Sequence, residues 1–285
     1  MTPDPISIVE SIADLRKAIA GRRAAGLVGF VPTMGALHAG HASLIARAHQ
    51  ECATVVVSIF VNPIQFDRPE DLERYPRSLE ADVALCRSLG VDLVFAPSVG
   101  EMYPKPLECS VDVGRLADHL CGRFRPGHFK GVATVVLKLL DIVCPDLAYF
   151  GQKDAQQLAI VKRLVADFNV PVRIVGVPTV REPDGLALSS RNQRLDTRER
   201  ALAPALYRAL QRVQRDIDAG VTDPGTLKQA GLREIPEDPA LRLEYLEIVD
   251  PDDFQPIDRI RGPVVAAGAL WVGTTRLIDN VTIAP

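Results

Sequence analysis

The chain has 285 residues, of which 47% are hydrophobic and 24% are charged, and its formal net charge is −3. This much apolar surface offsets the entropy of ordering a chain, so the composition excludes an intrinsically disordered protein. The balanced charge gives no basic footprint for nucleic acid, and no stretch reaches the roughly 18 apolar residues of a membrane-spanning helix. We therefore expect a soluble protein of about two domains that binds neither nucleic acid nor membrane.

The predicted elements of the first two-thirds alternate between short apolar segments rich in β-branched residues and segments of helical spacing. The predicted strands are residues 27–31, 53–61, 91–96, 147–150 and 172–177. The predicted helices are residues 12–23, 42–51, 79–89, 132–143 and 156–168. This alternation favours a parallel sheet covered on both faces, and right-handed crossovers then give a doubly wound, Rossmann-like α/β fold.

The last third of the chain has a different pattern. It predicts one long helix over 197–219 and three strands, at 241–249, 264–269 and 277–283. These elements indicate a smaller α+β domain at the C-terminal end. We therefore expect two domains, residues 1–182 and residues 183–285.

The five cysteines are odd in number and widely spaced, and no pair has the CxxC spacing. The first five residues, MTPDP, lack the basic-then-apolar order of a secretion signal. Both features are typical of a cytoplasmic protein with reduced thiols. We expect these thiols to pack in the interior rather than to bind metal.

The strongest functional signal is the segment FVPTMGALHAGH at residues 30–41. An apolar strand ends there and a helix is predicted to begin near Gly40, at the sheet edge where α/β proteins bind ligands. A helix N-terminus offers unpaired N–H groups to phosphate. His38 and His41 can face one side of the first helical turn and donate to phosphate oxygens. The alternatives are solvated or core histidines, or a zinc site that takes its third ligand from elsewhere.

The HAGH of residues 38–41 is similar to the HIGH signature of the nucleotidyltransferase superfamily. Four further blocks and the longer PTMGALHAGH resemble the pantothenate synthetases, a family also called pantoate–β-alanine ligases. The four blocks are FVNPIQF at 60–66, GHFKGV at 127–132, YFGQKD at 149–154 and LSSRN at 188–192. All five occur in the family order and span almost the whole chain, so the resemblance is far more specific than HxGH alone.

This resemblance implies an ATP-dependent ligase that condenses pantoate with β-alanine to pantothenate. The pantoate carboxylate would attack the α-phosphate of ATP, giving pantoyl adenylate and pyrophosphate, and the amine of β-alanine would then displace AMP. The resemblance also implies Mg²⁺ and a cytoplasmic homodimer.

The same resemblance assigns the site residues. His38, His41 and Lys153 are expected to be catalytic. Asn62, Gln65 and Gln157 are expected to bind substrate: Gln65 and Gln157 would hold pantoate, and Gln65 would also neighbour β-alanine. The residues expected to bind ATP are Met34, Gly35, Ala36, Leu37, His38, Ala39, Gly40, His41, Gly151, Gln152, Lys153, Asp154, Val180, Leu188, Ser189, Ser190 and Arg191. Apart from the resemblance, Asp82 and Asp154 are candidate magnesium ligands, and Asp154 could instead orient Lys153 or contact ribose.

The chemistry of these side chains suits such substrates. Neutral amides can donate to a carboxylate and accept from hydroxyl groups, and Lys153 can place a point charge against phosphate. Ser189–Arg191 resemble the place of the KMSKS motif in related enzymes, where Arg191 would supply bidentate contacts to phosphate. Gln152 stands where the family often has Glu, and it has no assigned role.

Two regions have several interpretations. The basic segment Arg123–Lys130 is either a solvated loop, a flap over the site or a group that steers anions. Residues 181–185 are predicted to form a hinge that lets the C-terminal domain close over the site.

Two rival functions remain open. One is a related nucleotidyltransferase that moves AMP onto a phosphate. The Asn-Pro-x-Gln and Gln-Lys-Asp-x-x-Gln blocks disfavour this function. The other is a non-catalytic protein that reports ATP through domain closure.

Overall fold

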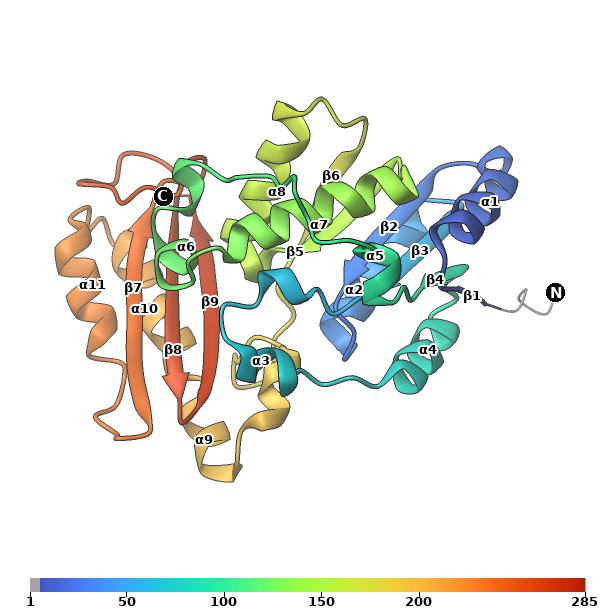
Figure 1. Ribbon diagram of the computed structural model, residues 1–285. Coiled ribbons are helices and arrows are strands. Elements are labelled where there is room, and N and C mark those ends of the chain that lie inside the picture. Colours follow the sequence, from blue (N-terminus) through green and yellow to red (C-terminus); the bar gives the residue numbers. More distant parts are fainter. Residues whose placement is uncertain (1–5, 285) are drawn as a thin grey trace. The chain divides into compact units, whose positions relative to one another are not determined.

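The computed structural model describes residues 6–284 of the chain. Residues 1–5, on which the expectation of no secretion signal rests, lie outside the described residues. Two compact units are present, and we call them unit 1 and unit 2 (Figure 1). Unit 1 contains the described residues through Val113 together with Pro126–Gln152 and Ile160–Pro178, and unit 2 contains Gly114–Arg125, Lys153–Ala159 and the described residues from Thr179 on. Two segments from the middle of the chain thus belong to unit 2, and the expected domains, 1–182 and 183–285, stay a prediction.

Unit 1 is built on a six-stranded parallel sheet in the order β1-β4-β3-β2-β5-β6. Its strands are β1 (Ser7–Val9), β2 (Val28–Thr33), β3 (Thr54–Ile59), β4 (Leu93–Phe95), β5 (Leu147–Gly151) and β6 (Arg173–Val177). The central strands are almost wholly buried, as expected for a parallel sheet with helices on both faces. The predicted doubly wound α/β sheet is confirmed, with the short edge strand β1 as an addition.

The strand order reverses between β2 and β5. From β2 the chain proceeds to β3 and β4 on one side, and then returns to form β5 and β6 on the other side. The carboxyl ends of β2 and β5 are therefore neighbours at the switch point. Open α/β sheets bind their ligands in the crevice beyond such a point.

Helices cover both faces of this sheet. The helices of unit 1 are α1 (Ile12–Arg22), α2 (Ala39–Glu51), α3 (Pro69–Glu73), α4 (Leu79–Ser88), α5 (Val99–Met102), α7 (His128–Val143) and α8 (Ala155–Asp167), of which α8 is divided between the units. Leu44 of α2 and Val83 of α4 pack with Val55 and Val57 of β3 in one core cluster. Helix α7 packs against α1 and β2, and it begins one turn earlier than the predicted 132–143.

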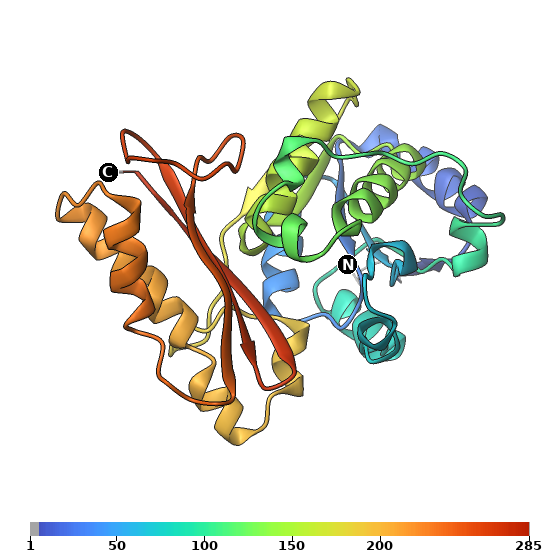
Figure 2. The same ribbon diagram turned by 60° about the vertical axis from the view of Figure 1, so that its left-hand side comes forward.

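Unit 2 contains a three-stranded antiparallel sheet, in the order β7-β8-β9, against which α10 and α11 pack on one face (Figure 2). Its elements are β7 (Leu241–Val249), β8 (Val264–Val272), β9 (Thr275–Ile283), α6 (Leu120–Phe124), α9 (Thr197–Leu202), α10 (Ala205–Asp218) and α11 (Pro224–Leu232). Leu210, Leu227 and Leu270 are among its fully buried core residues. The predicted small α+β fold at the C-terminal end is thereby confirmed.

The predicted single helix over 197–219 is wrong. Helix α9 ends at Leu202 and α10 begins at Ala205, with Pro204 between them. Proline has no N–H to bond the carbonyl of Arg200, and its ring crowds the preceding turn. The sequence pattern also does not predict α11, although Asp223 is a typical cap residue whose carboxylate accepts from the N–H of Thr226 at 2.7 Å.

All five cysteines are free thiols. Cys52, Cys86 and Cys121 are buried, which confirms their expected packing, whereas the expectation is wrong for Cys109 and Cys144, which are exposed. Within residues 6–284, no helix combines the length and the apolar character that crossing a membrane requires.

Candidate active site

The turn that follows β2 is fixed by Asp82 of α4. Gly35 and Ala36 have positive φ angles of 81° and 51°, which bend the chain away from the strand. The N–H groups of Ala36 and Leu37 donate to the two carboxylate oxygens of Asp82, over 2.9 and 2.7 Å. A Cβ added to Gly35 would lie 2.8 Å from one of these oxygens. Asp82 therefore shapes the turn from which the two histidines extend.

His38 and His41 cap the first turn of α2 reciprocally. The N–H of Gly40 donates to Nδ1 of His38 over 3.1 Å, and the N–H of His38 donates to Nδ1 of His41 over 3.2 Å. The two ring centroids lie 4.2 Å apart, which confirms that both rings share one side of the turn. Because Nδ1 of each ring accepts a bond, the neutral ring carries its proton on Nε2. Each histidine thus has an Nε2–H donor of the kind that a phosphate oxygen accepts.

Asn62 and Gln65 form a buried amide pair at the carboxyl end of β3. Nδ2 of Asn62 donates to Oε1 of Gln65 over 2.9 Å and to the carbonyl of Gly131 over 3.3 Å. Oδ1 of Asn62 accepts from the Tyr103 hydroxyl over 2.7 Å, and Nε2 of Gln65 lies 3.1 Å from the sulfur of Met34. This pair therefore joins the end of β3 to the turn that follows β2.

Two residues without an assigned site role in the sequence support this amide pair. Burial raises the pKa of Tyr103 to about 12, so its hydroxyl remains a donor at neutral pH. Nδ1 of His128 lies 2.8 Å from the carbonyl oxygen of Gln65, and His128 is buried. The interpretation that His128 belongs to a solvated loop is wrong, because His128 is buried and is the first residue of α7.

Helix α7 comes very close to the 3₁₀ turn η2 (Pro63–Gln65). A Cβ added to Gly131 would lie 2.3 Å from the carbonyl oxygen of Ile64 and 2.7 Å from Cα of Gln65. Only glycine permits this approach without moving the backbone. Gly131 therefore helps to set the position of Gln65.

The carboxyl end of β5 supplies a second group of the predicted residues. Gly151 ends β5, and the exposed Gln152 begins the 3₁₀ turn η4 (Gln152–Asp154). Since β5 pairs with β2, Gly151 and Gln152 lie at the same switch point of unit 1 as the histidine turn. Lys153 and Asp154 belong to unit 2, where Nζ of Lys153 lies 3.9 Å from Oδ2 of Asp154.

Gln156 of α8 is a structural clamp that the sequence motifs do not assign. Its Oε1 accepts from the N–H of Cys121 over 3.0 Å, and its Nε2 donates to the carbonyls of Leu116 and His119, both over 2.8 Å. The clamp binds the segment 114–125 to the first turn of α8. It thereby fixes the turn that carries Gln157, the predicted substrate-binding residue.

The remaining predicted ATP-binding residues lie on a tight hairpin of unit 2. The N–H of Leu188 donates to the carbonyl of Val180 over 3.0 Å, and Arg181 and Ala187 form an antiparallel bridge. Directly after the hairpin, the hydroxyl of Ser189 accepts from the N–H of Arg191 over 3.3 Å and caps η5 (Ser190–Arg194). Val180, Leu188 and Ser189–Arg191 are therefore one locally ordered piece of chain.

The structure thus collects the predicted residues in two groups. Unit 1 holds the histidine turn, Asn62, Gln65, Asp82, Gly151 and Gln152. Unit 2 holds Lys153, Asp154, Gln157 and the hairpin with Ser189–Arg191.

Of the two predicted magnesium ligands, Asp82 and Asp154, only Asp154 has a carboxylate suited to bind the ion. The oxygens of Asp82 already accept two backbone N–H bonds, whereas the Asp154 side chain is 46% exposed. No group of three or more His, Cys, Asp or Glu residues that could hold a metal occurs within residues 6–284. Mg²⁺ that travels with ATP needs only one or two protein carboxylates, so Asp154 fits such an ion and both roles stay predictions.

A family model described as Pantoate-beta-alanine ligase matches residues 7–282 of the chain. Pantothenate synthetase 1 of Bradyrhizobium diazoefficiens is 50% identical over 98% of this chain and 99% of its own length. The bifunctional pantoate ligase/cytidylate kinase of Thermosynechococcus vestitus is 58% identical over 94% of this chain but only 53% of its own length. The chain therefore spans about half the length of these bifunctional relatives.

Solved structures agree with this relationship. The pantothenate synthetase of Thermus thermophilus has a TM-score of 0.93 and 47% identity, covering 98% of this chain and all of that one. The pantoate-beta-alanine ligase of Francisella tularensis, described in complex with beta-gamma ATP and beta-alanine, has a TM-score of 0.79 and 36% identity over 97% of both chains. With its confirmed fold, its HxGH turn at the switch point and a match over nearly its full length, the chain belongs to the pantoate-beta-alanine ligase family.

Proposed function

We propose that this chain is an ATP-dependent ligase that condenses pantoate with β-alanine to pantothenate through a pantoyl adenylate. The observation that carries the proposal is the reciprocal cap of His38 and His41, which fixes both rings in the first turn of α2, directly after the strand that borders the switch point of a family member's sheet. The family membership of the chain supports the choice of substrates.

In the first step, a carboxylate oxygen of pantoate attacks the α-phosphorus of ATP. The bond between the α-phosphorus and the bridging oxygen breaks, and pyrophosphate leaves with that oxygen. His38 and His41 donate to the phosphate oxygens on which negative charge develops, and preorganised donors of this kind contribute roughly 2.7–4 kcal/mol each.

In the second step, the amine nitrogen of β-alanine attacks the acyl carbon of the adenylate. The carbon–oxygen bond to phosphate breaks, AMP leaves, and the nitrogen loses a proton as the amide forms. The buried amides of Asn62 and Gln65 orient the pantoyl group, since a thioether sulfur is only a weak acceptor and the substrate is a better partner for Nε2 of Gln65.

Unit 2 contributes charge in this proposal. Lys153 and Ser189–Arg191 contact the ATP phosphates, Gln157 contacts pantoate, and Val180 and Leu188 lie near adenine. The C-terminal domain closes over the site so that water is kept from the adenylate. Mg²⁺ held by Asp154 would neutralise phosphate charge.

The working enzyme is a homodimer in the cytoplasm. Sedimentation gives a direct test of the dimer.

The decisive experiment measures AMP release from ATP and Mg²⁺ with pantoate alone, with β-alanine alone and with both. Steady release only with both acids, together with pyrophosphate exchange into ATP that needs pantoate alone, supports the ligase. Transfer of AMP to a phosphate acceptor would establish the related nucleotidyltransferase instead. ATP binding without turnover would establish the non-catalytic sensor.

A further inference from the structure

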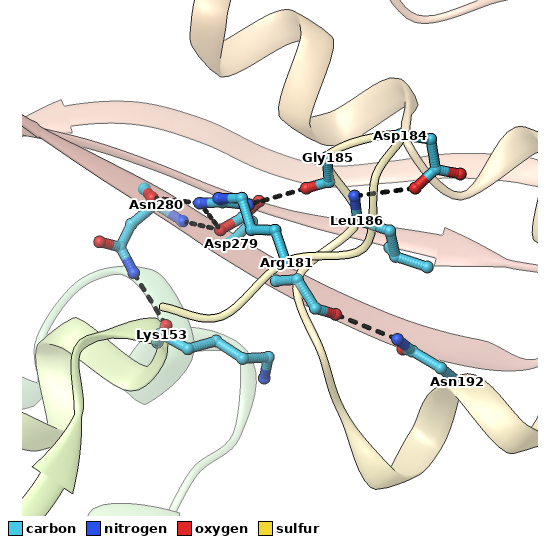
Figure 3. Close-up of polar contacts among 9 residues, drawn as sticks. Lys153, Arg181, Asp184, Gly185, Leu186, Asn192, Asp279 and Asn280 are labelled. Atoms are coloured by element: carbon cyan, nitrogen blue, oxygen red, sulfur yellow. Dashed lines mark hydrogen bonds and ion pairs between the residues drawn. The ribbon is translucent and has the colours of Figure 1, made fainter. Parts of the chain in front are cut away.

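Two neighbouring residues in the middle of β9 hold two segments of unit 2 that lie far away in the sequence. Figure 3 shows Asp279 and Asn280 between the turn of Lys153 and the hairpin of Arg181. Neither residue belongs to a sequence block that resembles the family motifs. The contacts they make are nevertheless with the two segments to which phosphate binding is assigned.

Asp279 holds the hairpin through Arg181. The guanidinium donates to both carboxylate oxygens of Asp279, over 2.5 and 2.9 Å, and also to the carbonyl of Gly185 over 3.0 Å. It lies 3.9 Å from the ring centroid of Tyr207, which covers its face. The side chains of Arg181 and Asp279 are only 18% and 5% exposed, so this ion pair has one fixed geometry rather than that of a mobile surface pair.

The hairpin transmits that position to the phosphate-binding residues. Its strands are joined by the bridge of Arg181 with Ala187, and Nδ2 of Asn192 donates to the carbonyl of Ala187 over 3.0 Å. Asn192 belongs to η5, the turn that contains Ser190 and Arg191. A continuous chain of hydrogen bonds therefore runs from Asp279 to this turn.

Asn280 holds the turn of Lys153. Its Nδ2 donates to the carbonyl of Lys153 over 2.8 Å, and its own N–H donates to Oδ1 of Asp279 over 2.8 Å. Burial raises the pKa of the Asp279 carboxyl, and the positive charges of Arg181 and Lys153 oppose that rise. The Asp279 carboxylate therefore interacts electrostatically with both cationic side chains.

We propose that Asp279 and Asn280 are positioning residues of the adenylation step, which keep Lys153 and the Ser189–Arg191 turn at a fixed spacing. The proposal rests on the proposed function, because it assigns these two segments to the phosphates of one ATP. Neither Asp279 nor Asn280 contacts substrate. Both act through the backbone and side chains that they hold.

The test uses Asn280→Asp, which exchanges one donor group for an acceptor at almost constant volume. The ionised carboxylate cannot donate to the Lys153 carbonyl, so we expect kcat for adenylation to fall about fivefold to tenfold. The KM for pantoate should stay within about twofold, because Asn62 and Gln65 belong to unit 1 and the Gln156 clamp still holds the turn that carries Gln157. As the pH falls, the introduced carboxyl becomes protonated and can donate again, so the ratio of variant to wild-type kcat should rise toward one.

Two comparisons separate positioning from general damage. In a Lys153→Ala background, Asn280→Asp should cause little further loss, since the group that it positions is gone. The matched control is Glu244→Gln. Glu244 of β7 forms a comparably buried ion pair with Arg276, which belongs to β9 like Asp279 and Asn280, and the side chains of Glu244 and Arg276 are 10% and 13% exposed. We expect this control to keep kcat even if its melting temperature falls.

Hydrogen–deuterium exchange gives a readout that does not need catalysis. Asn280→Asp should speed exchange in peptides covering 150–157, and Asp279→Asn should speed it in peptides covering 181–192. Unchanged exchange in both would overturn the proposal, as would a kcat loss that persists in full without Lys153 or appears equally in Glu244→Gln. If Asn280→Asp does not fold, Asn280→Ser gives the same comparisons in the Lys153→Ala background and in hydrogen–deuterium exchange. A wild-type chain that makes no AMP would refute the proposed function, whereas the exchange result still decides whether the two residues hold these segments.

Discussion

The two units hold their predicted phosphate-binding residues in different ways. In unit 1, the cap that orients His38 and His41 spans only two and three residues of chain. In unit 2, the bonds that anchor Lys153 and Arg181 span 127 and 98 residues. A contiguous motif can therefore encode the first arrangement almost alone, whereas the second exists only once β9 has joined its sheet.

The largest expected effect tests the local arrangement. His41→Ala or His38→Ala should lower the adenylation rate at least about a hundredfold, because each removes a preorganised donor to developing charge. Pyrophosphate exchange into ATP measures this step, and circular dichroism checks the fold. His49→Ala is the matched control, since His49 is exposed in the last turn of the same helix. A near-normal rate in either of the first two variants would remove that histidine from the mechanism.

A comparable effect is expected from the distant arrangement. Lys153→Ala should lower adenylation about a hundredfold through loss of a phosphate-binding charge. The KM for pantoate should change little. Single-turnover measurement of adenylate formation detects the lower rate. Lys162→Ala is the control, because Lys162 is an exposed lysine of α8. Unchanged ATP kinetics in Lys153→Ala would refute the phosphate role of Lys153.

A smaller effect tests how unit 1 depends on its own long-range packing. Gly131→Ala places a Cβ against the backbone of η2, which we expect to cost about 1–3 kcal/mol of unfolding free energy. The KM for pantoate should rise as well, because Gln65 must shift. Urea unfolding and steady-state kinetics measure the two effects.

Gly21→Ala is the matched control for this substitution, since Gly21 lies in α1 with no heavy atom near its added Cβ. It should stabilise the chain by roughly 0.5–1 kcal/mol. Equal stability changes in the two variants would show that α7 and η2 can separate freely.

The smallest effect concerns thiol reactivity and leaves activity untouched. Burial raises the pKa of Cys86 to about 12, so at pH 8 only about one molecule in ten thousand carries the reactive thiolate. Cys109 and Cys144 are exposed and should react with iodoacetamide within minutes in the folded chain, whereas Cys86 should react only on unfolding. Mass spectrometry of the labelled peptides measures this. Rapid labelling of Cys86 would mean that the face of the sheet covered by α2 and α4 opens readily.

Some features of the fold could be predicted because their causes are local. The alternation of β-branched runs with helical spacing is a property of short windows, and it predicted the parallel sheet and its flanking helices. The boundaries were less accurate. The break at Pro204 requires one residue to outweigh a long helical pattern, and the early start of α7 depends on packing against η2.

The sequence by itself determined the fold class, the family and the histidine turn, because backbone propensity, strand alternation and a reciprocal cap all act over a few neighbouring residues. Only the tertiary structure decided that Asp82 shapes that turn, that Gln156 clamps a distant segment and that Asp279 and Asn280 anchor two others. An amide or carboxylate in a sequence does not name its partner. The partner is fixed only when folding removes water from both groups and leaves each to satisfy the other.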